Sequence, residues 1–450
     1  MNSNRRVLAF VLSSTAILLL TSFLTELFHY KSSIPLNNIN LIADILKKDP
    51  AVTDDDSLGA DPPAIEIVEK ARENFFLYRQ GHIITDFNTD TTDPSLSRFL
   101  QKLHALKSGK KGKVRIAYFG DSMIEGDLLT QTLRKLLQQV FGGSGVGFVP
   151  VTSQVAQFRQ TVTDNFSDGW EDANFKSGNS KHLFFSGHLF RTSGASVQMI
   201  DHTVTDTAAI IEKSILCGHV PRQVNITVNG ASFTLNPDKA FNRITLHNDR
   251  SKGIKVAVAN DQLPVYGISF ETTSGIIVDN FSFRGITGIE WAGVDSSFLE
   301  SVEENNPYDL IILQYGVNLL FRPNDKNFSW YAKSMLPVIR KFRNCFKETD
   351  LIIVSTADRA FRYGSQYRSA TGIDSLIKVQ AALAFETNSC FYNQFETMGG
   401  TNSIVEWAGR KPPLANKDYV HPNHKGAEVL ATYFFEAMMK DYEKYVQSLK

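Results

Sequence analysis

The sequence predicts an α/β fold in which helices sandwich a parallel sheet, with an inserted all-β sandwich and an N-terminal transmembrane helix. Three observations support this fold. Strand-like apolar runs alternate with segments of helical spacing around residue 114 and again after residue 276. From 152 to 273 the composition changes to alternating stretches rich in Thr, Val and Phe. The chain has 450 residues and is 42% hydrophobic, enough for roughly two to three domains.

The N-terminus predicts a membrane anchor. Arg5 and Arg6 precede an apolar run at residues 7–28, close to the ~20 residues that a membrane span requires. Positive charge before the span keeps the N-terminus in the cytoplasm and sends the rest across. A cleaved signal peptide is the alternative, but no convincing cleavage site follows the run. We expect a single-pass anchor at 1–30 and a linker at 31–63, with the remainder on the far side of the membrane.

The remainder divides into three predicted parts. Residues 64–151 and 274–450 form the two halves of the α/β domain, and residues 152–273 form the insert. In the α/β halves, helices are expected at 64–79, 96–106, 128–141, 330–346, 375–386 and 426–442, and strands at 114–119, 276–283, 310–313 and 351–355. In the insert, Asn229-Gly230 predicts a hairpin turn within 225–235, and strands are expected at 243–246 and 255–258.

The stretch at 114–127, VRIAYFGDSMIEGD, carries the first candidate for chemistry. Gly120 ends its apolar run, and Asp121 and Ser122 follow on the turn. The carboxyl end of a buried strand is the ligand-binding edge of such a sheet. We expect the Ser122 N–H to point from a helix N-terminus toward a developing oxyanion. The alternative is that Asp121 or Ser122 is only a helix N-cap.

Three distant stretches favour the catalytic interpretation. DNFSFRG ends in Gly285, YGVN ends in Asn318, and DYVHPNHKG contains Asp418 and His421. A serine needs a base to take its proton, and an aspartate three residues before a histidine can orient its ring. Alternatively, Asp418 and His421 cap the last helix, Asn318 is a turn residue and Gly285 only provides φ > 0.

Together with the GDS turn, these blocks resemble the SGNH (GDSL) hydrolases, whose sheet is flavodoxin-like. The resemblance implies a nucleophile at Ser122, a base at His421 and an orienting carboxylate at Asp418. It also implies an oxyanion hole formed by the Ser122 and Gly285 backbone N–H groups and the Asn318 side-chain amide. Leu319 stands where the family often has aspartate, a departure that leaves the amide donor intact. His424 is the nearest competitor for the base, but the DxxH spacing selects His421.

One branch of that family is particularly similar. GDSMIEGD, followed by LR and FGGSGVGFVP, a β-rich insert and DN…RG, resembles the periplasmic peptidoglycan O-acetylesterases, which carry a carbohydrate-binding-module-like β-domain. The resemblance implies removal of O-acetyl groups from a cell-envelope glycan, peptidoglycan or another polysaccharide, through an acetyl-serine intermediate. It also implies that the anchor lies in the inner membrane and the catalytic part in the periplasm, and we expect the insert to widen the contact with such a polymeric substrate. An SGNH-type glycan O-acetyltransferase would use the same residues. A non-catalytic, membrane-tethered glycan-binding protein is the third possibility.

Composition excludes other classes. Lys+Arg and Asp+Glu both number 47, so no net charge favours nucleic acid as a partner. The three cysteines are too few and too scattered for a disulfide framework or a zinc site, although one pair could bond. No spacing indicates a metal site, and no cofactor is expected. The absence of a G-x-S-x-G elbow argues against an α/β-hydrolase.

Overall fold

The computed structural model describes residues 74–88, 94–178 and 180–450. The predicted anchor and linker lie outside these residues, as does most of the helix predicted at 64–79. Its last part, Phe75–Arg79, is a short 3₁₀ helix. Within the described ranges, no helix is both long enough and apolar enough to cross a membrane.

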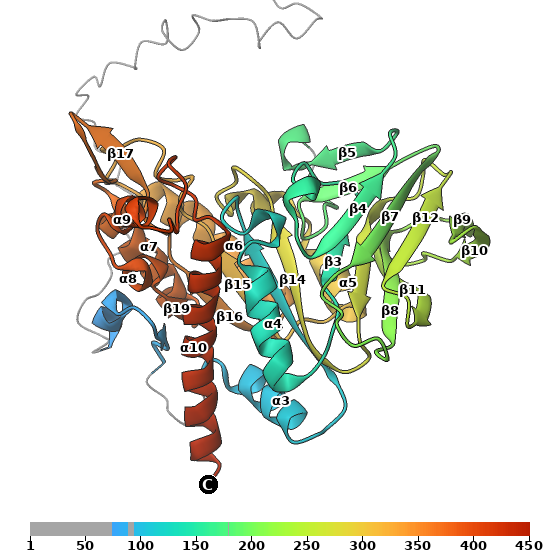
Figure 1. The fold of residues 1–450 in the computed structure, drawn as a ribbon, viewed down its shortest axis with the longest axis horizontal. Coiled ribbons are helices and arrows are strands. Elements are labelled where there is room, and N and C mark those ends of the chain that lie inside the picture. Colours follow the sequence, from blue (N-terminus) through green and yellow to red (C-terminus); the bar gives the residue numbers. More distant parts are fainter. Residues whose placement is uncertain (1–73, 89–93, 179) are drawn as a thin grey trace, which may run out of the picture. The chain divides into compact units, whose positions relative to one another are not determined.

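One sheet carries all the predicted α/β strands (Figure 1). Its strands pair in parallel, except that the first is antiparallel to its neighbour. In spatial order they are β1 (Ile84–Thr85), β19 (Cys390–Tyr392), β16 (Asp350–Val354), β15 (Leu310–Gln314), β2 (Lys113–Gly120) and β14 (Gly275–Ser282). The prediction of a parallel sheet is therefore confirmed.

Helices cover both faces of this sheet because successive strand side chains point to opposite faces. In β2, Ile116 and Tyr118 belong to one apolar core, and Ala117 and Phe119 belong to another. The first core includes residues of α3 (Ser97–Lys107), α4 (Thr130–Phe141), α9 (Ser403–Gly409) and α10 (His424–Ser448). The second includes residues of α5 (Ser296–Asn305), α6 (Ser329–Cys345) and α7 (Ile373–Glu386). The short helix α8 (Gln394–Met398) contributes to both.

Two antiparallel sheets form the inserted β-domain. One has the order β10 (Ala231–Leu235), β9 (Val224–Val228), β12 (Gly253–Val258), β7 (Ala195–Asp201) and β4 (Val162–Phe166). The other has the order β11 (Phe241–Asp249), β8 (Ile211–Gly218), β13 (Val265–Glu271), β6 (His188–Arg191) and β5 (Glu171–Asn174). Residues of both sheets share one apolar core, so the domain is a sandwich. The predicted hairpin is present, with φ of 51° at Asn229 and 89° at Gly230.

The β-domain begins slightly before the predicted boundary at 152. Strand β3 (Gly147–Pro150) pairs with β13 of the insert and is therefore part of its second sheet. Phe148 of β3 also belongs to the core shared with Phe119 and Phe281 of the parallel sheet. This continuous aromatic core fixes the sandwich against the α/β domain. Apart from that boundary, the predicted segmentation stays a prediction.

The remaining elements are short. A hairpin of β17 (Ala360–Tyr363) and β18 (Gln366–Ser369) lies apart from the three sheets. Further 3₁₀ helices occur at Glu125–Asp127, Ala156–Phe158, Phe175–Ser177 and Ile289–Gly293.

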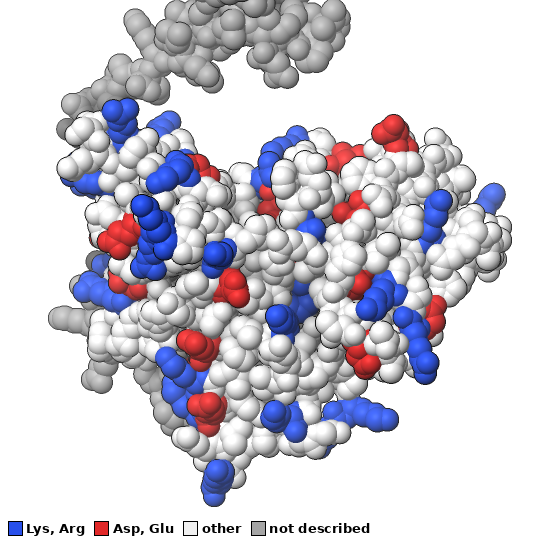
Figure 2. Space-filling view, viewed as in Figure 1, with Lys and Arg blue, Asp and Glu red and all other residues white. Residues whose placement is uncertain are grey.

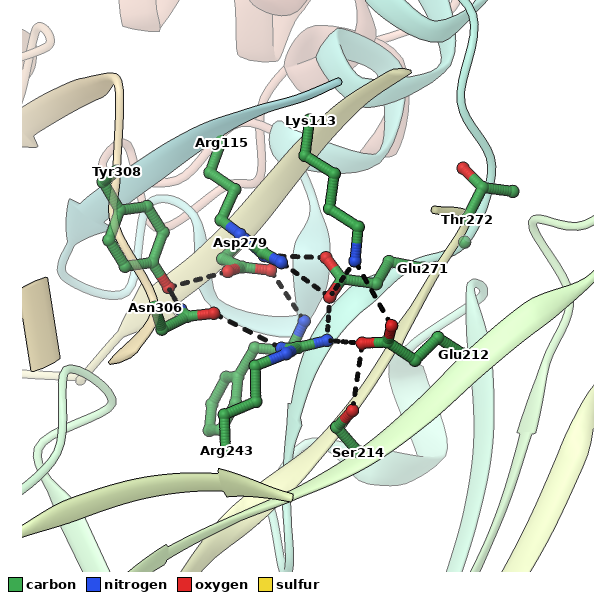
Figure 3. A network of polar contacts seen from close by, with 12 residues as sticks. Lys113, Arg115, Glu212, Ser214, Arg243, Glu271, Thr272, Asp279, Asn306 and Tyr308 are labelled. Carbon is green, nitrogen blue, oxygen red and sulfur yellow. Dashed lines mark hydrogen bonds and ion pairs between the residues drawn. The ribbon is translucent and has the colours of Figure 1, made fainter. Parts of the chain in front are cut away.

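A buried ionic network also joins the two domains (Figure 3). Glu271 of β13 is fully buried and accepts two 2.7 Å hydrogen bonds from Arg115 of β2. It also contacts Arg243 of β11 and lies 3.2 Å from the ammonium group of Lys113. Burial, together with the neighbouring guanidinium groups, lowers the pKa of Lys113 to about 8. Glu271 thus contacts three cations from both domains, and Glu212 of β8 reinforces the network by pairing with Arg243 at 2.8 Å and with Lys113 at 3.5 Å.

Candidate active site

The four motif blocks meet at the carboxyl edge of the parallel sheet. Ser122 follows β2, Gly285 follows β14 and Asn318 follows β15, and these strands are adjacent. Parallel neighbours end at the same edge, so the loops after them lie together. The Asp418–His421 stretch approaches from the segment before α10.

Ser122, His421 and Asp418 form a continuous hydrogen-bonded chain. The Ser122 hydroxyl lies 2.8 Å from His421 Nε2. On the other side of the ring, His421 Nδ1 lies 2.7 Å from Asp418 Oδ2. A proton on Nδ1, donated to the carboxylate, leaves Nε2 as an acceptor for the serine hydroxyl. This is the arrangement of a serine nucleophile, a base and an orienting carboxylate.

The local backbone explains how a three-residue spacing achieves this geometry. Asp418 Oδ1 accepts hydrogen bonds from the backbone N–H groups of Val420 and His421, at 3.0 and 3.1 Å. Tyr419, which lies between Asp418 and Val420, has a φ of 55°. This left-handed backbone conformation tightens the loop and turns His421 back toward the Asp418 carboxylate. The ring of Tyr367 on β18 packs against the ring of Tyr419, with ring centroids 4.2 Å apart.

Asp418 is held in its ionised form. Burial by itself would raise the pKa of this carboxyl, but the hydrogen bonds from the His421 side chain and from two backbone N–H groups lower it below its ordinary value. A carboxylate that stays ionised can stabilise the imidazolium that forms when His421 takes a proton.

The last helix is capped by a different residue. The N-cap of α10 is Asn423, whose side chain accepts a hydrogen bond from the Gly426 N–H at 3.1 Å. Asp418 and His421 are therefore not caps of that helix, as the alternative interpretation required. His424 is the exposed first residue of α10, and it is His421 that bonds Ser122.

One expectation about Ser122 was wrong. The serine does not open a helix, because a turn and the 3₁₀ helix Glu125–Asp127 separate it from α4, which begins at Thr130. The first turn after β2 is closed instead by a hydrogen bond from the Ile124 N–H to the Asp121 carbonyl oxygen. Glycines and acidic side chains in GDSMIEGD favour tight turns, and this signal was in the sequence.

Asp121 is a buried turn residue beside the nucleophile. Its Oδ1 accepts a hydrogen bond from the Met123 N–H at 2.9 Å, so its side chain closes the turn. Only 1% of its surface is exposed, and this burial raises its pKa to about 7. Within the described residues, none of the hydrogen bonds of the Asp121 side chain involves His421. This is consistent with a role of Asp121 in holding the turn.

Asn318 lies at the predicted place, but its amide is already engaged. The side-chain nitrogen donates to Asp121 Oδ2 at 3.1 Å and to the Ile286 carbonyl oxygen at 2.9 Å. Two side chains hold its loop: Arg359 donates a hydrogen bond to the Val317 carbonyl oxygen, and Gln380 donates one to the Tyr315 carbonyl oxygen. A role in an oxyanion hole therefore requires the amide to share or exchange one of these partners.

Gly285 has the positive φ that one of its two interpretations requires, and its role as an oxyanion donor stays a prediction. Its φ of 83° lies in the left-handed region, where a side chain is strained. A Cβ built there would meet no atom within 4 Å, so the surroundings are open. The preceding residue, Arg284, forms an ion pair with Glu125, with Nη2 and Oε2 2.6 Å apart.

A cavity of about 420 Å³ opens over the serine. Its wall contains Ser122 and His421, the Glu125–Arg284 pair, and the apolar side chains of Val155 and Phe158. Phe158 is 64% exposed, an unusual state for a large aromatic side chain. Sequence reasoning missed Val155 and Phe158, since no motif marks them, and it gave no role to Arg284, although this arginine stands in the DN…RG segment. Within the ranges that the structure describes, no three His, Cys, Asp or Glu residues are grouped to hold a metal ion.

The strand order and the motif positions are those expected of the SGNH/GDSL hydrolase fold. Among solved structures the chain is similar to a peptidoglycan O-acetylesterase, with a TM-score of 0.69 and 21% identity over 80% of this chain and 99% of that one. At that identity the likeness is one of fold. No protein-family model matches the chain, and neither does any curated protein.

Two weaker similarities involve esterases acting on carbohydrates. A family two carbohydrate esterase from Cellvibrio japonicus aligns with a TM-score of 0.27 and 10% identity, over 63% of this chain and 99% of that one. The acetylxylan esterase Axe2 from Geobacillus stearothermophilus aligns with a TM-score of 0.27 and 20% identity, over 37% of this chain and 73% of that one. These scores are too low to bear on fold or function.

Proposed function

We propose that this protein is a serine esterase that removes O-acetyl groups from a cell-envelope glycan. The observation that carries the proposal is the hydrogen-bonded chain from Ser122 through His421 to Asp418. A decayed enzyme that served only as a scaffold would have no need to keep all three residues in this geometry. The proposal assigns Ser122 as nucleophile, His421 as base and Asp418 as orienting carboxylate.

In the first half-reaction the Ser122 oxygen attacks the acetyl carbonyl carbon while His421 Nε2 takes the hydroxyl proton. The C–O bond to the sugar then breaks, and the sugar oxygen leaves with the proton from the imidazolium. This step leaves an acetyl group on Ser122. In the second half-reaction His421 takes a proton from water, the resulting hydroxide attacks the acetyl carbon, and acetate leaves as Ser122 regains its proton.

The tetrahedral intermediates place a negative charge on the former carbonyl oxygen. We assign its stabilisation to the backbone N–H groups of Ser122 and Gly285 and to the Asn318 amide. Such donors contribute about 3–4 kcal/mol each in serine hydrolases. The charged oxygen is a stronger acceptor than the Ile286 carbonyl that the amide now bonds, so exchange of that partner is favourable.

The glycan substrate is supported by the shared fold. The similarity to a peptidoglycan O-acetylesterase extends over 80% of this chain, which is more than the α/β domain alone contains and so includes the inserted sandwich. The cavity over Ser122 is lined by polar and apolar side chains and has room for an acetyl group on a sugar.

Acetate release from the full-length protein in detergent tests the proposal. An aryl acetate and an O-acetylated envelope polysaccharide would be supplied in turn, with Ser122→Ala as the control. We expect free acetate from both substrates and none from the variant. Acetyl groups appearing on an added sugar acceptor, in preference to water, would identify a transferase. Glycan binding by a folded but inactive wild type would identify a binding protein.

The proposal also includes an inner-membrane anchor and a periplasmic catalytic part. This rests on Arg5, Arg6 and the apolar run at 7–28, which lie outside the described residues. Full-length protein should fractionate with membranes, and protease added from the periplasmic side should digest most of it. A soluble form that begins near residue 31 would show cleavage and refute the anchor.

A further inference from the structure

A second cavity, of about 120 Å³, lies beside the one over Ser122. Both cavities share Glu125, Gly126 and Arg284 in their walls, so the Glu125–Arg284 ion pair forms the partition between them. Beyond this partition the second cavity is walled largely by the inserted domain, through Asp172 of β5 and His188 of β6. The insert therefore meets the α/β domain beside the candidate nucleophile.

The wall of the second cavity mixes hydrogen-bond donors, acceptors and aromatic surface. His188 Nδ1 lies 2.8 Å from Asp172 Oδ1, an arrangement that fixes the His188 ring. This ring packs on Phe283, with centroids 4.9 Å apart. The Lys176 ammonium group lies 5.7 Å from the centroid of the same phenylalanine ring. Sugars present hydroxyl groups around an apolar ring face, and this combination of groups complements them.

Two residues of the wall have polar atoms without a protein partner. Ser186 is 3% exposed, and its hydroxyl group makes no hydrogen bond within the part of the chain that the structure describes. The Arg159 side chain is 7% exposed, and its Nη2 makes no such bond there either, although Asp127 Oδ2 lies 3.9 Å away. Buried polar groups usually have partners. A polar ligand in the cavity can satisfy both groups, which an apolar ligand could not.

We propose that this second cavity binds a further sugar residue of the glycan chain when the acetylated residue lies over Ser122. This deepens the proposed function and rests on it. The chain would cross the Glu125–Arg284 partition, whose guanidinium group is half exposed and able to donate to the sugar between the two cavities. The inserted domain thereby makes the enzyme prefer a glycan chain to a single sugar.

The test compares substrates that differ only in chain length. Full-length protein in detergent would be given chemically O-acetylated N-acetylglucosamine and its O-acetylated tetramer, and kcat/KM measured for each. We expect wild type to favour the tetramer at least tenfold. Ser186→Ala and Lys176→Met should each lower the ratio of tetramer to monomer kcat/KM by about 3- to 10-fold, mainly through KM, as expected for one lost hydrogen bond.

Ser269→Ala is the matched control. Ser269 is 1% exposed and its hydroxyl is likewise without a partner in the described residues, but it lies on β13 and outside both cavity walls. Its substitution should leave the ratio unchanged. A wild type without preference for the tetramer, or a ratio that Ser186→Ala and Lys176→Met leave unchanged, would refute the second sugar site. Failure of wild type on both substrates and on an aryl acetate would instead refute the proposed function.

Discussion

The side-chain amide of Asn318 donates a 3.1 Å hydrogen bond to Asp121 Oδ2, which links the loop after β15 to the turn that carries Ser122. Asp121 in turn accepts from the Met123 N–H on that turn. The candidate nucleophile and the candidate oxyanion donor are therefore positioned by one buried carboxyl. This relationship gives the GDS aspartate a physical role that does not involve proton transfer.

The first prediction concerns Asn318. Asn318→Ala removes the only side-chain donor assigned to the oxyanion, and it should lower kcat about 10²- to 10³-fold with a smaller change in KM. Initial rates on an aryl acetate, with folding checked by circular dichroism, measure this effect. A loss confined to KM would show that the amide contributes to substrate binding and not to the transition state.

The second prediction concerns the hydrogen-bonded chain. Ser122→Ala and His421→Ala should each abolish nearly all turnover, and the double variant should be little worse, because residues that act as a unit are not additive. Asp418→Asn should retain more activity, since it perturbs the orientation of His421 without removing a reacting group. His424→Ala is the control: it removes an exposed side chain of the cavity wall at the start of α10 but no reacting group, and it should stay close to wild type. A dead His424→Ala with an active His421→Ala would reverse the assignment of the base.

The third prediction concerns pH and Asp127. Burial alone would raise the pKa of this carboxyl, but the Arg134 and Arg159 guanidinium groups hold it at about 2. Because the folded-state pKa lies below the unfolded value of 3.8, the ionised carboxylate stabilises the fold above pH 4, and this contribution is lost as the pH falls toward 2.

The Asp127→Asn variant should therefore have a lower free energy of unfolding than wild type at neutral pH. This difference in free energy should shrink by about 2 kcal/mol between pH 5 and pH 2. Urea unfolding of both proteins across that range measures the difference. A deficit independent of pH would mean that Asp127 contributes through packing and not through its charge.

The fourth prediction concerns the ionic network between the domains. Glu271→Gln leaves the buried Arg115 without its carboxylate and Arg243 with Glu212 alone, and should lower the free energy of unfolding by about 3–5 kcal/mol. The control is Glu348→Ala, which breaks an exposed ion pair with Arg98 and should cost less than about 1 kcal/mol. Equal small losses from both variants would show that the network is not needed to hold the domains together.

The same interface explains why point substitutions test the insert better than its deletion would. The core that includes Phe119 of the parallel sheet also includes Phe148, Phe184 and Tyr266 of the β-domain. Deleting the insert would expose this core. A loss of activity would then report unfolding and would say nothing about substrate choice.

Much of the fold was predictable because its signals are local. The apolar run before Ser122 and those before Gly285 and Asn318 are strands, and the alternation of strands and helices requires a parallel sheet whose carboxyl edge collects the three loops. The DxxH spacing of Asp418 and His421 is also local, since one tight turn suffices to bring the carboxylate to the ring. The sequence by itself therefore determined the sheet, the place of each motif and which histidine follows the aspartate.

Only the tertiary structure decided the features that join distant parts of the chain. The Glu125–Arg284 partition and the contact of Glu271 with Arg115 each join residues more than 150 positions apart. No periodicity or spacing records such pairs. The first depends on which strands of the parallel sheet are neighbours, because Glu125 follows β2 and Arg284 follows β14, and the second depends on how the sandwich docks against the sheet. The tertiary structure also pairs β3 with β13 of the insert, and it places the second cavity beside the one over Ser122. Short-range physics fixes strands, helices and turns, whereas the surfaces between domains exist only once both have folded.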